Sequence, residues 1–383
     1  MIRVLFVSHS AELNGAELWL FETLKRLDRG RYRPTLVTPR PGPLNDSASA
    51  LGIDVHVVPM KWWLTERSRV WRQPLAGLLN AAGVRKIADV ARSSEAGLVF
   101  SNSAAMSSGA RAARAVGVPH VWAVHEILGG QRPFLHHILG RRAAVNFILR
   151  NSARVIVNSE ASRAAFPANE KLRLVYNGVD VKDGDERRQA ALRKELGIRD
   201  EDIVAGVVGK IYEGKGQREA LQAAASLAPR YPRLKWLIVG AVRDERYARG
   251  LSELVRAAGI ADRIRFTGYH PDLVDLLKIM TVVVIPSVVE SFGRVALEAM
   301  AAGVPVVAVR AGGLPEIVAH GENGFLAETR DPANIAGMLD FVLRNPDKAK
   351  RAAENGLKTV REKFSVERQV RGVESVLAEV AKD

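Results

Sequence analysis

The sequence contains no cysteine, so none of its 383 residues can form a disulfide or a thiolate metal site. The absence of both is typical of a protein from a reducing compartment. No apolar run approaches the roughly 20 residues that span a bilayer. The first segment, "MIRVLFVSHSAELNG", is too polar for a signal peptide and predicts a β-strand. We therefore expect a cytoplasmic protein, either free or bound peripherally to the inner face of the membrane.

Acidic residues are scarce in the first half of the chain. Residues 1–180 hold 24 Lys and Arg against 13 Asp and Glu, whereas the remainder holds 32 against 29. Most of the formal net charge of +14 therefore belongs to the first half. This asymmetry indicates an anionic partner, such as an anionic membrane surface, a phosphorylated substrate or nucleic acid. Nucleic acid is the least favoured of these, because no nucleic-acid-binding motif occurs.

Short apolar runs alternate with helical stretches along the whole chain. The runs are "IRVLFVS", "RPTLVTP", "IDVHVVP", "GLVFSNS", "HVWAVHE", "ARVIVNS" and "LRLVYNG" in the first half, and "DIVAGVVG", "LKWLIVG", "RIRFTG", "TVVVIP", "VPVVAV" and "NGFLAE" in the second. Continuous apolar runs predict parallel strands covered on both faces by helices. A polar stretch near 178–200 separates the two series. We predict two Rossmann-like, doubly wound α/β domains, residues 1–180 and 181–364, and a final amphipathic helix over 365–383.

Doubly wound sheets bind ligands at the carboxyl ends of their strands, so the cleft between two such domains is the expected site. Residues 207–221, "VVGKIYEGKGQREAL", follow this pattern, with Gly209, Lys210, Gly214 and Lys215 between a strand and a helix that begins near Gln217. Close backbone approach, a helix N-terminus and two lysines suit a diphosphate. The order of residues matches neither a Walker loop nor GxGxxG, and an ordinary turn with solvated lysines remains the alternative.

Two loops of the first half occupy comparable positions. In "SHSAELNGAE", Gly15 stands where the first helix begins, which is a position that favours anions. In "HVWAVHEI", His125 and Glu126 follow a predicted strand and are candidates to face the cleft. A plain strand–helix connection and a structural histidine are the alternatives. The histidine spacings HxxxH and HExxH do not occur, so we expect no metal site.

Two further stretches are distinctive. "ESFGRVALEAM" places Glu290 in a loop after a strand and Glu298 eight residues later inside a helix. Spacing alone does not distinguish a ligand-binding pair from a solvated helix face. "PMKWWLTERSRVWRQPL", residues 59–75, mixes Trp62, Trp63 and Trp71 with basic residues. This mixture suits a membrane interface or single-stranded nucleic acid, and burial of one or two tryptophans in the core is the alternative.

The order of these motifs resembles that of the family-4 retaining glycosyltransferases of the GT-B fold. "YNGVD", "GKIYEGKG", "FTGY", "IPSVVESFGRVALEAMAAGVPVVA", "GGLPEIV" and "GENGFL" occur in the family's order, and the resemblance spans nearly the whole chain. It is most specific in the second half, around the two glutamates, and loosest between residues 59 and 150. It implies that the second domain binds a nucleotide-sugar donor, that no cofactor or metal takes part, and that a saccharide or lipid-linked molecule is the acceptor.

The resemblance also assigns roles to individual residues. It implies that Lys215 and Lys210 bind the donor diphosphate, although the family often has Arg at the second position. Glu290 matches a glutamate near the transferred sugar, and Phe292 and Gly293 match a loop whose amides approach sugar and phosphate. The remaining matches are Glu298 with a ribose-binding glutamate, His125 with a histidine beside the sugar, and Gly15 with a loop facing phosphate and acceptor.

The implied reaction is transfer of the sugar with retention of configuration in polysaccharide or glycoconjugate biosynthesis. Lysines and helix N-termini would stabilise the charge that develops on the leaving diphosphate. A nucleotide-sugar epimerase and a non-catalytic nucleotide-sugar-binding protein on the same fold are the rival predictions.

Overall fold

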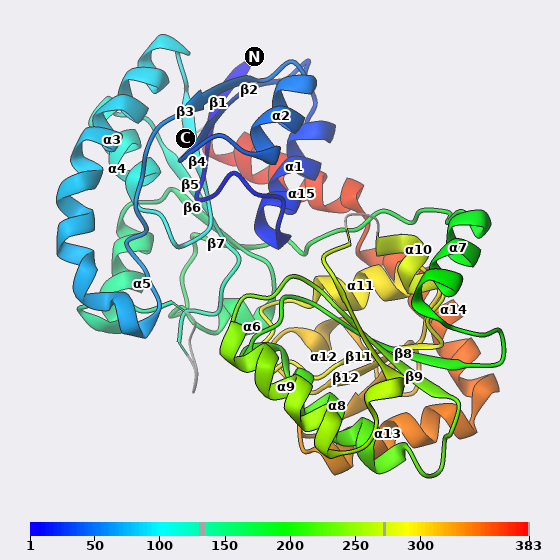
Figure 1. The fold of residues 1–383 in the computed structure, drawn as a ribbon. Helices are drawn as coiled ribbons and strands as arrows, with labels where there is room; N and C mark the ends of the chain where they lie inside the picture. The colour runs from blue at the N-terminus through cyan, green and yellow to red at the C-terminus, as the bar shows by residue number, and fades with distance from the viewer. Residues whose placement is uncertain (130–134, 271–272, 382–383) are drawn as a thin grey trace. The chain divides into compact units, whose positions relative to one another are not determined.

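The structure is a computed structural model, and it describes residues 1–129, 135–270 and 273–381. The chain divides into two compact units. Unit 1 comprises Met1–Gly178 and Val366–Asp383, and unit 2 comprises Val179–Ser365. Each unit has one parallel sheet with helices on both faces (Figure 1).

Unit 1 contains a seven-stranded sheet in the order β3-β2-β1-β4-β5-β6-β7, and every pairing is parallel. Its strands are β1 (Ile2–Ser8), β2 (Tyr32–Thr38), β3 (Asp54–Val57), β4 (Leu98–Asn102), β5 (His120–Val124), β6 (Arg154–Val157) and β7 (Leu172–Leu174). Its helices are α1 (Gly15–Arg26), α2 (Pro43–Ala50), η1 (Arg67–Arg72), α3 (Gln73–Ser93), α4 (Ser108–Val116), α5 (Gly140–Arg150), α6 (Glu160–Arg163) and α15 (Val366–Val380).

Unit 2 contains a six-stranded parallel sheet in the order β10-β9-β8-β11-β12-β13. Its strands are β8 (Ile203–Val208), β9 (Leu234–Val239), β10 (Ile264–Gly268), β11 (Val282–Ile285), β12 (Val306–Val309) and β13 (Phe325–Ala327). Its helices are α7 (Glu186–Leu196), η2 (Glu213–Lys215), α8 (Gln217–Leu227), α9 (Glu245–Ala257), η3 (Ala261–Arg263), α10 (Leu273–Lys278), α11 (Arg294–Ala301), α12 (Leu314–Ile317), α13 (Pro332–Arg344) and α14 (Pro346–Lys363).

The central strands of both sheets are buried on both faces, as the continuous apolar runs predict, whereas the edge strands β3 and β10 are partly exposed. On β1, Val4 and Phe6 pack with α1 and α15, whereas Leu5 and Val7 pack into a second cluster with α3 and α4. In unit 2, alternate residues of β8, β11 and β12 pack against α8, α9 and α13. All thirteen predicted runs form strands, so the prediction of two doubly wound sheets is confirmed.

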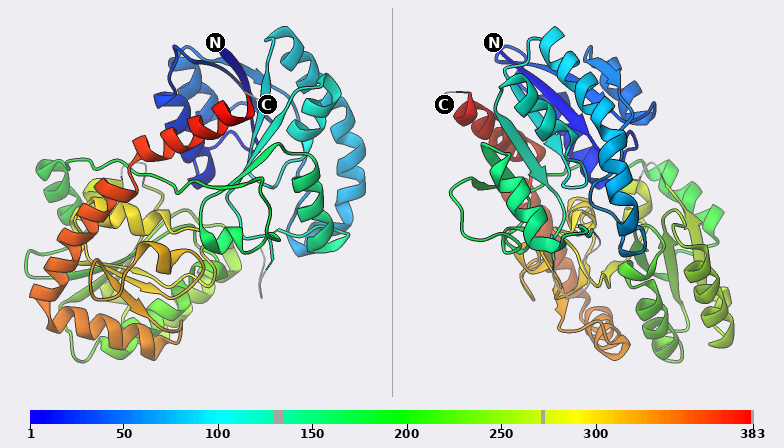
Figure 2. Two further views of the ribbon diagram at one scale, coloured as in Figure 1. Left: turned by 180° about the vertical axis from the view of Figure 1, so that it is seen from behind. Right: turned by 90° about the vertical axis from the view of Figure 1, so that its left-hand side faces the viewer.

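Helix α15 belongs to unit 1 although it ends the sequence, and it lies beside α1 (Figure 2). The buried amide of Gln369 donates to the backbone oxygen of Trp19, 3.0 Å away. Further along, the carboxylate of Glu379 accepts hydrogen bonds from Arg154 at 2.7 Å and from Arg173 at 2.9 Å. Apolar burial and these polar contacts together fix the helix on unit 1.

Candidate functional site

In both sheets the strand order reverses between two neighbouring strands, β1 and β4 in unit 1 and β8 and β11 in unit 2. Loops that leave the carboxyl ends of such neighbours diverge, and ligands of doubly wound sheets bind there. In unit 2 these loops carry Lys215 and Glu290. The ammonium group of Lys215 donates to Oε2 of Glu290 at 2.7 Å. The structure therefore brings together two site residues that lie 75 positions apart in the sequence.

Lys215 is held in place by the backbone around it. Its side chain is 21% exposed and that of Glu290 is 16% exposed. Burial is the largest single influence on the pKa of Lys215 and lowers it, but the charge of Glu290, the nearby Tyr212 and the hydrogen bond to Glu290 together outweigh burial, so the pKa is raised. Gly216 follows with φ of 71°, and a Cβ there would lie 2.0 Å from the carbonyl oxygen of Pro286. Only glycine allows the lysine loop to approach the loop after β11 so closely.

The Glu290 loop is held from its other side by a pair of glycines. The amide of Gly313 donates to the carbonyl oxygen of Glu290 at 2.9 Å. Gly312 has φ of 53°, and a Cβ on it would lie 1.9 Å from that same oxygen. The "GGLPEIV" motif therefore positions the Glu290 backbone. This role was missed in the sequence, where the two glycines precede a short helix without any sign of their partner.

The predicted site residues that follow Glu290 have different environments. Phe292 is buried and its ring packs edge-on against Phe364, with 5.9 Å between the centroids. Only its backbone can therefore reach a ligand. Gly293, with φ of 113°, immediately precedes α11. Within this helix Glu298 accepts a hydrogen bond from Nε of Arg294 at 2.7 Å, so Glu298 is oriented by a neighbour one turn away.

The start of the lysine loop lies directly after β8. Gly209 has φ of 145°, and a Cβ on it would contact the aliphatic stem of Lys215 at 3.5 Å. Lys210 is exposed, and its backbone oxygen accepts a hydrogen bond from the side chain of Gln217 at 3.0 Å. Gln217 is fully buried at the first position of α8, as predicted for the helix start. Its role as a loop support is not evident from its position in the sequence.

In unit 1, His125 and the start of α1 are joined by Asn102 at the end of β4. The Asn102 amide nitrogen donates to the carbonyl oxygen of Ala16, 2.9 Å away. Its Oδ1 must therefore accept, and it lies 2.7 Å from Nε2 of His125. Burial chiefly, and the nearby His9 secondarily, lower the pKa of His125 to about 3. Gly15 opens α1, and a Cβ on it would have no atom within 4 Å, so nothing inside the chain requires glycine there.

Glu126 has a structural role instead of facing a ligand. Its carboxylate accepts hydrogen bonds from the hydroxyl of Ser103 and from the amides of Ala104 and His125, the latter two at 3.1 Å. Ser103 has φ of 91°, which is uncommon for a residue with a side chain. Glu126 therefore stabilises the turn after β4 beside His125.

A second histidine at this edge was missed in the sequence. His9 follows β1, and its Nε2 lies 3.2 Å from Oε1 of Glu17, whose side chain is 2% exposed. The indole nitrogen of Trp62 donates to the backbone oxygen of His9 at 3.1 Å, and the two rings lie 5.5 Å apart. The loop after β1 was recognised in the sequence by its glycine, and nothing in the sequence marks its histidine.

The three tryptophans of residues 59–75 have different environments. Trp63 is buried and lies 6.1 Å from the ring of Trp122, whereas Trp62 is 37% exposed and Trp71 is 69% exposed. The alternative of core burial therefore holds for Trp63 and fails for Trp71.

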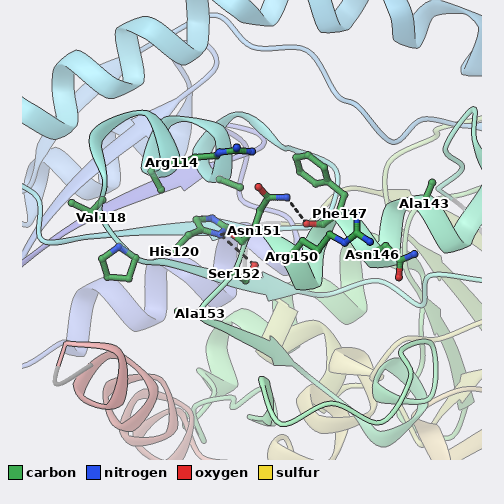
Figure 3. Close-up of a pocket in the computed structure, with 13 residues that line it drawn as sticks. Arg114, Val118, His120, Ala143, Asn146, Phe147, Arg150, Asn151, Ser152 and Ala153 are labelled. Carbon is green, nitrogen blue, oxygen red and sulfur yellow. Dashed lines mark hydrogen bonds between the residues drawn. The ribbon is translucent and has the colours of Figure 1, made fainter.

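A hollow of about 900 Å³ lies between α4 and α5 of unit 1 (Figure 3). Its lining includes Arg114, Arg150 and His120. His120 begins β5, whereas His125 follows the end of that strand, so this hollow lies at the opposite edge of the sheet. Both ring nitrogens of His120 have partners, Ser101 at 2.8 Å and the backbone of Asn151 at 3.1 Å. His120 is therefore held by its own neighbours and has no ring nitrogen left for a ligand in the hollow.

Within the described ranges, the structure contains no cluster of three or more His, Asp and Glu side chains placed to hold a metal ion. None of the helices described is both long enough and apolar enough to cross a membrane.

Two family models match the chain, one in each half. Residues 13–183 match Glycosyltransferase Family 4, and residues 188–359 match Glycosyl transferases group 1. D-inositol 3-phosphate glycosyltransferase from Corynebacterium urealyticum is 37% identical over 228 residues, which cover 56% of this chain and 54% of that protein. N-acetyl-alpha-D-glucosaminyl L-malate synthase from Bacillus anthracis is 30% identical over 215 residues, covering 56% and 55%. The chain thus spans about half the length of the curated relatives it matches.

Similarity to solved structures extends over the whole chain. Anabaena HepE, crystallised in complex with UDP-glucose, is 28% identical with a TM-score of 0.85, and the match covers 99% of this chain and 100% of that one. The same protein has also been crystallised with UDP and glucose, at 27% identity and the same TM-score. With two parallel-sheet units, and with both halves matched by the family models, the chain belongs to the family-4 glycosyltransferases of the GT-B fold.

Proposed function

We propose that the protein transfers a sugar from a nucleotide-diphosphate sugar to a saccharide or lipid-linked acceptor, in polysaccharide or glycoconjugate biosynthesis. The observation that carries this proposal is the contact between Lys215 and Glu290 at the carboxyl ends of β8 and β11. A lysine whose raised pKa keeps it charged, beside a helix N-terminus, can neutralise a diphosphate. A carboxylate next to it suits the hydroxyls and developing positive charge of a sugar.

In the proposed reaction the bond between the anomeric carbon and the diphosphate breaks. Lys215, Lys210 and the start of α8 stabilise the negative charge that grows on the leaving group. The backbone amides at Phe292 and Gly293 contact sugar and phosphate, and Glu298 accepts hydrogen bonds from the ribose hydroxyls. Arg294 supports this last role because it holds the Glu298 carboxylate in one orientation.

We further propose that the configuration at the anomeric carbon is retained and that no metal is needed. The acceptor hydroxyl attacks from the side that the phosphate leaves, and the departing phosphate oxygen takes its proton. His125, neutral because burial lowers its pKa to about 3, accepts a hydrogen bond from a hydroxyl of the transferred sugar. Gly15 keeps the start of α1 open to phosphate and acceptor. Transfer to the acceptor instead of hydrolysis requires that water be excluded from the reacting carbon.

The test begins with a thermal-shift panel of nucleotide sugars that includes UDP-glucose, with which HepE was crystallised. The donor that stabilises the protein is then followed by NMR for turnover and for the anomeric configuration of the product, with and without EDTA. Lys215→Ala and Glu290→Ala should each abolish most transfer while the protein stays folded. Lys358→Ala and Glu328→Ala remove surface charges from exposed ion pairs of the same unit and should leave the rate unchanged.

Normal turnover in both site variants would overturn the proposal. An epimerase would convert the donor sugar without any acceptor, and a binding protein would show donor affinity without turnover. Loss of activity with EDTA would refute metal independence, and an inverted product would refute retention.

A lipid-linked acceptor would lie at a membrane, and one face of unit 1 suits an anionic bilayer. Trp71 and Leu139 are 69% and 75% exposed. The segments that carry them are joined through Gln73, which accepts a hydrogen bond from the amide of Ile138 at 2.8 Å and donates to the oxygen of His136 at 2.6 Å. Exposed aromatic and aliphatic side chains on one such face are typical of interfacial binding.

The positive charge of this face also favours an anionic bilayer as its partner. Arg72, Arg141 and Arg142 are exposed on these segments, and residues 67–88 and 127–159 contain no acidic residue. We propose that this face contacts anionic lipid. Sedimentation with vesicles of phosphatidylcholine alone or mixed with phosphatidylglycerol tests it. Arg141→Gln with Arg142→Gln should weaken binding to the anionic vesicles roughly 10- to 30-fold, at about 1 kcal/mol per charge.

The matched control is Arg187→Gln with Arg188→Gln, an exposed arginine pair on α7 of unit 2, which should bind as the unchanged protein does. Failure of the unchanged protein to bind anionic vesicles would refute a membrane partner. Equal loss in both double variants would refute a localised face.

A further inference from the structure

His9 and His125, which follow β1 and β5 of unit 1, share an unusual arrangement. In each ring Nε2 has an oxygen partner, Glu17 at 3.2 Å for His9 and Asn102 at 2.7 Å for His125. In each ring Nδ1 is buried and has no hydrogen-bond partner in the described part of the chain. Buried polar atoms in folded proteins usually have partners, so two such atoms at one edge of a sheet indicate a ligand.

The partners determine which nitrogen carries the proton. An ionised carboxylate can only accept a hydrogen bond, and the Asn102 oxygen also accepts, so each Nε2 must be the donor. In a neutral ring Nδ1 then presents a lone pair. Such an atom can bind only a donor, such as a hydroxyl. A fully ionised phosphate, which offers no hydrogen, cannot satisfy it.

Glu17 is an acidic side chain in an almost fully buried position. Its side chain is 2% exposed, and His9 is its one polar partner among the described residues. A buried carboxylate with a single partner costs more than an apolar side chain of similar size. Its presence is explained if it orients His9 for a ligand. Trp62 adds an apolar wall, since its partly exposed ring lies 5.5 Å from that of His9.

We propose that His9 is a saccharide-binding residue and that Glu17 positions it. The Nδ1 atom of His9 accepts a hydrogen bond from a hydroxyl of the acceptor, and Trp62 packs on the sugar's C–H face. The group of the acceptor bound at Nδ1 is therefore a sugar hydroxyl and not an ionised phosphate oxygen. This inference rests on the proposed function, because it takes unit 1 as the unit that binds the acceptor.

The first experiment needs no activity. In protein labelled with ¹⁵N at histidine, long-range correlations to the ring protons should show the Nε2–H form for His9. With UDP present, D-glucose, D-galactose, D-mannose and myo-inositol are then added in turn. At least one should move the Nδ1 resonance of His9 to lower frequency, as expected when a lone pair accepts a hydrogen bond. Sulfate, an anion that carries no proton at neutral pH, should not move it.

His56 is the matched control, because its Nε2 also contacts a carboxylate, Asp54 at 2.9 Å, but on an exposed strand. Its resonances should stay unchanged throughout. An Nδ1–H form of His9, a response to sulfate, or no response to any of the four polyols would overturn the inference. So would equal shifts at His9 and His56.

A pair of variants tests the roles of the two ring nitrogens of His9 separately. In His9→Gln the amide can reach the Nε2 position and still donate to Glu17, but nothing replaces Nδ1. In His9→Asn the side-chain oxygen lies near the Nδ1 position and the Glu17 contact is lost. Once an acceptor is in use, His9→Gln should raise its KM roughly 5- to 50-fold, the cost of a lost hydroxyl contact. His9→Asn should recover part of this loss.

UDP affinity distinguishes a failure of the inference about His9 from a failure of the proposed function. Unchanged UDP affinity with an unchanged acceptor KM in His9→Gln would overturn this inference and leave the proposed function intact. Absence of any nucleotide-sugar binding in the unchanged protein would overturn the proposed function, while the histidine resonances would still report on the saccharide site.

Discussion

Because Lys215 and Glu290 are in contact, substituting one or the other should have different effects on the free energy of unfolding and on the affinity for UDP. Lys215→Met leaves the Glu290 carboxylate, 16% exposed, without its partner at 2.7 Å. Removing one member of a fully buried pair costs about 3–5 kcal/mol, and an exposed pair costs less than about 1 kcal/mol. For this mostly buried pair we expect a loss of about 2 kcal/mol in the free energy of unfolding. Glu290→Gln keeps an acceptor oxygen for the lysine and should cost about 1 kcal/mol.

Nucleotide binding should separate the two variants more clearly, because only the lysine variant should lose UDP affinity. Lys215→Met removes a charge-assisted hydrogen bond to the diphosphate, worth about 1.5–3 kcal/mol, so the Kd for UDP should rise roughly 10- to 150-fold. Glu290→Gln removes a negative charge that repels the diphosphate and competes for the lysine. The Kd for UDP should stay the same or fall, although transfer is lost.

Urea unfolding and isothermal calorimetry with UDP, applied to both single variants and to the double variant, measure these effects. The double variant should be more stable than the sum of the single losses predicts, since it leaves no unpaired charge. Additivity within about 0.3 kcal/mol would refute an energetic coupling between the two side chains. Unchanged UDP affinity in Lys215→Met would refute the phosphate-binding role of the lysine.

Three further predictions concern the supports of the site. Gly312→Ala should destabilise unit 2 by more than about 1 kcal/mol in thermal or urea unfolding, because its Cβ would meet the Glu290 oxygen, whereas Gly52→Ala, with φ of 71° but open space, should cost less. The pKa of Glu379 is lowered chiefly by its hydrogen bond with Arg173, so its contribution to stability is present above the ordinary carboxyl pKa and is lost as pH falls through the lowered value. Urea unfolding at pH 7 and pH 3 should therefore differ less in Glu379→Gln than in the unchanged protein. Burial lowers the pKa of His120 and of His125 to about 3. Between pH 6.5 and 3 the unfolded chain therefore binds protons that the folded chain does not, so the free energy of unfolding should decrease as the pH is lowered. Each histidine contributes a slope of about 1.4 kcal/mol per pH unit, which His125→Asn should reduce.

The fold could be predicted because its determinants are local. A strand buried on both faces must be apolar along its whole length, and each predicted run became a strand. The starts of α1 at Gly15 and of α8 at Gln217 follow glycine-containing loops and lie within one residue of their predicted positions. Helix α7 was missed within the polar stretch at the start of unit 2, since only Leu192 of its residues is buried and its pattern carries little periodicity.

The site could be predicted only in part, because its contacts join distant loops. Lys215 and Glu290 could be identified from the sequence, but no pattern in the sequence indicates that one side chain contacts the other. Asn102, Glu17 and His9 stayed unnoticed for the same reason. Each is an ordinary residue at the end of a strand or in the first turn of a helix, and its role arises only when β1, β4 and β5 lie side by side.

The pairing of Lys215 with Glu290 also bears on how tightly a donor can bind. A solitary buried lysine would be costly to keep charged, because burial lowers its pKa. The charge and hydrogen bond of Glu290, together with Tyr212, reverse that effect and raise the pKa, so the lysine is charged before any nucleotide arrives. If the lysine binds the donor as proposed, a diphosphate would have to compete with the glutamate for it, and the nucleotide affinity would reflect the difference between two ion pairs. The glutamate that holds the lysine ready therefore also limits nucleotide affinity, which favours release of the nucleotide diphosphate after transfer.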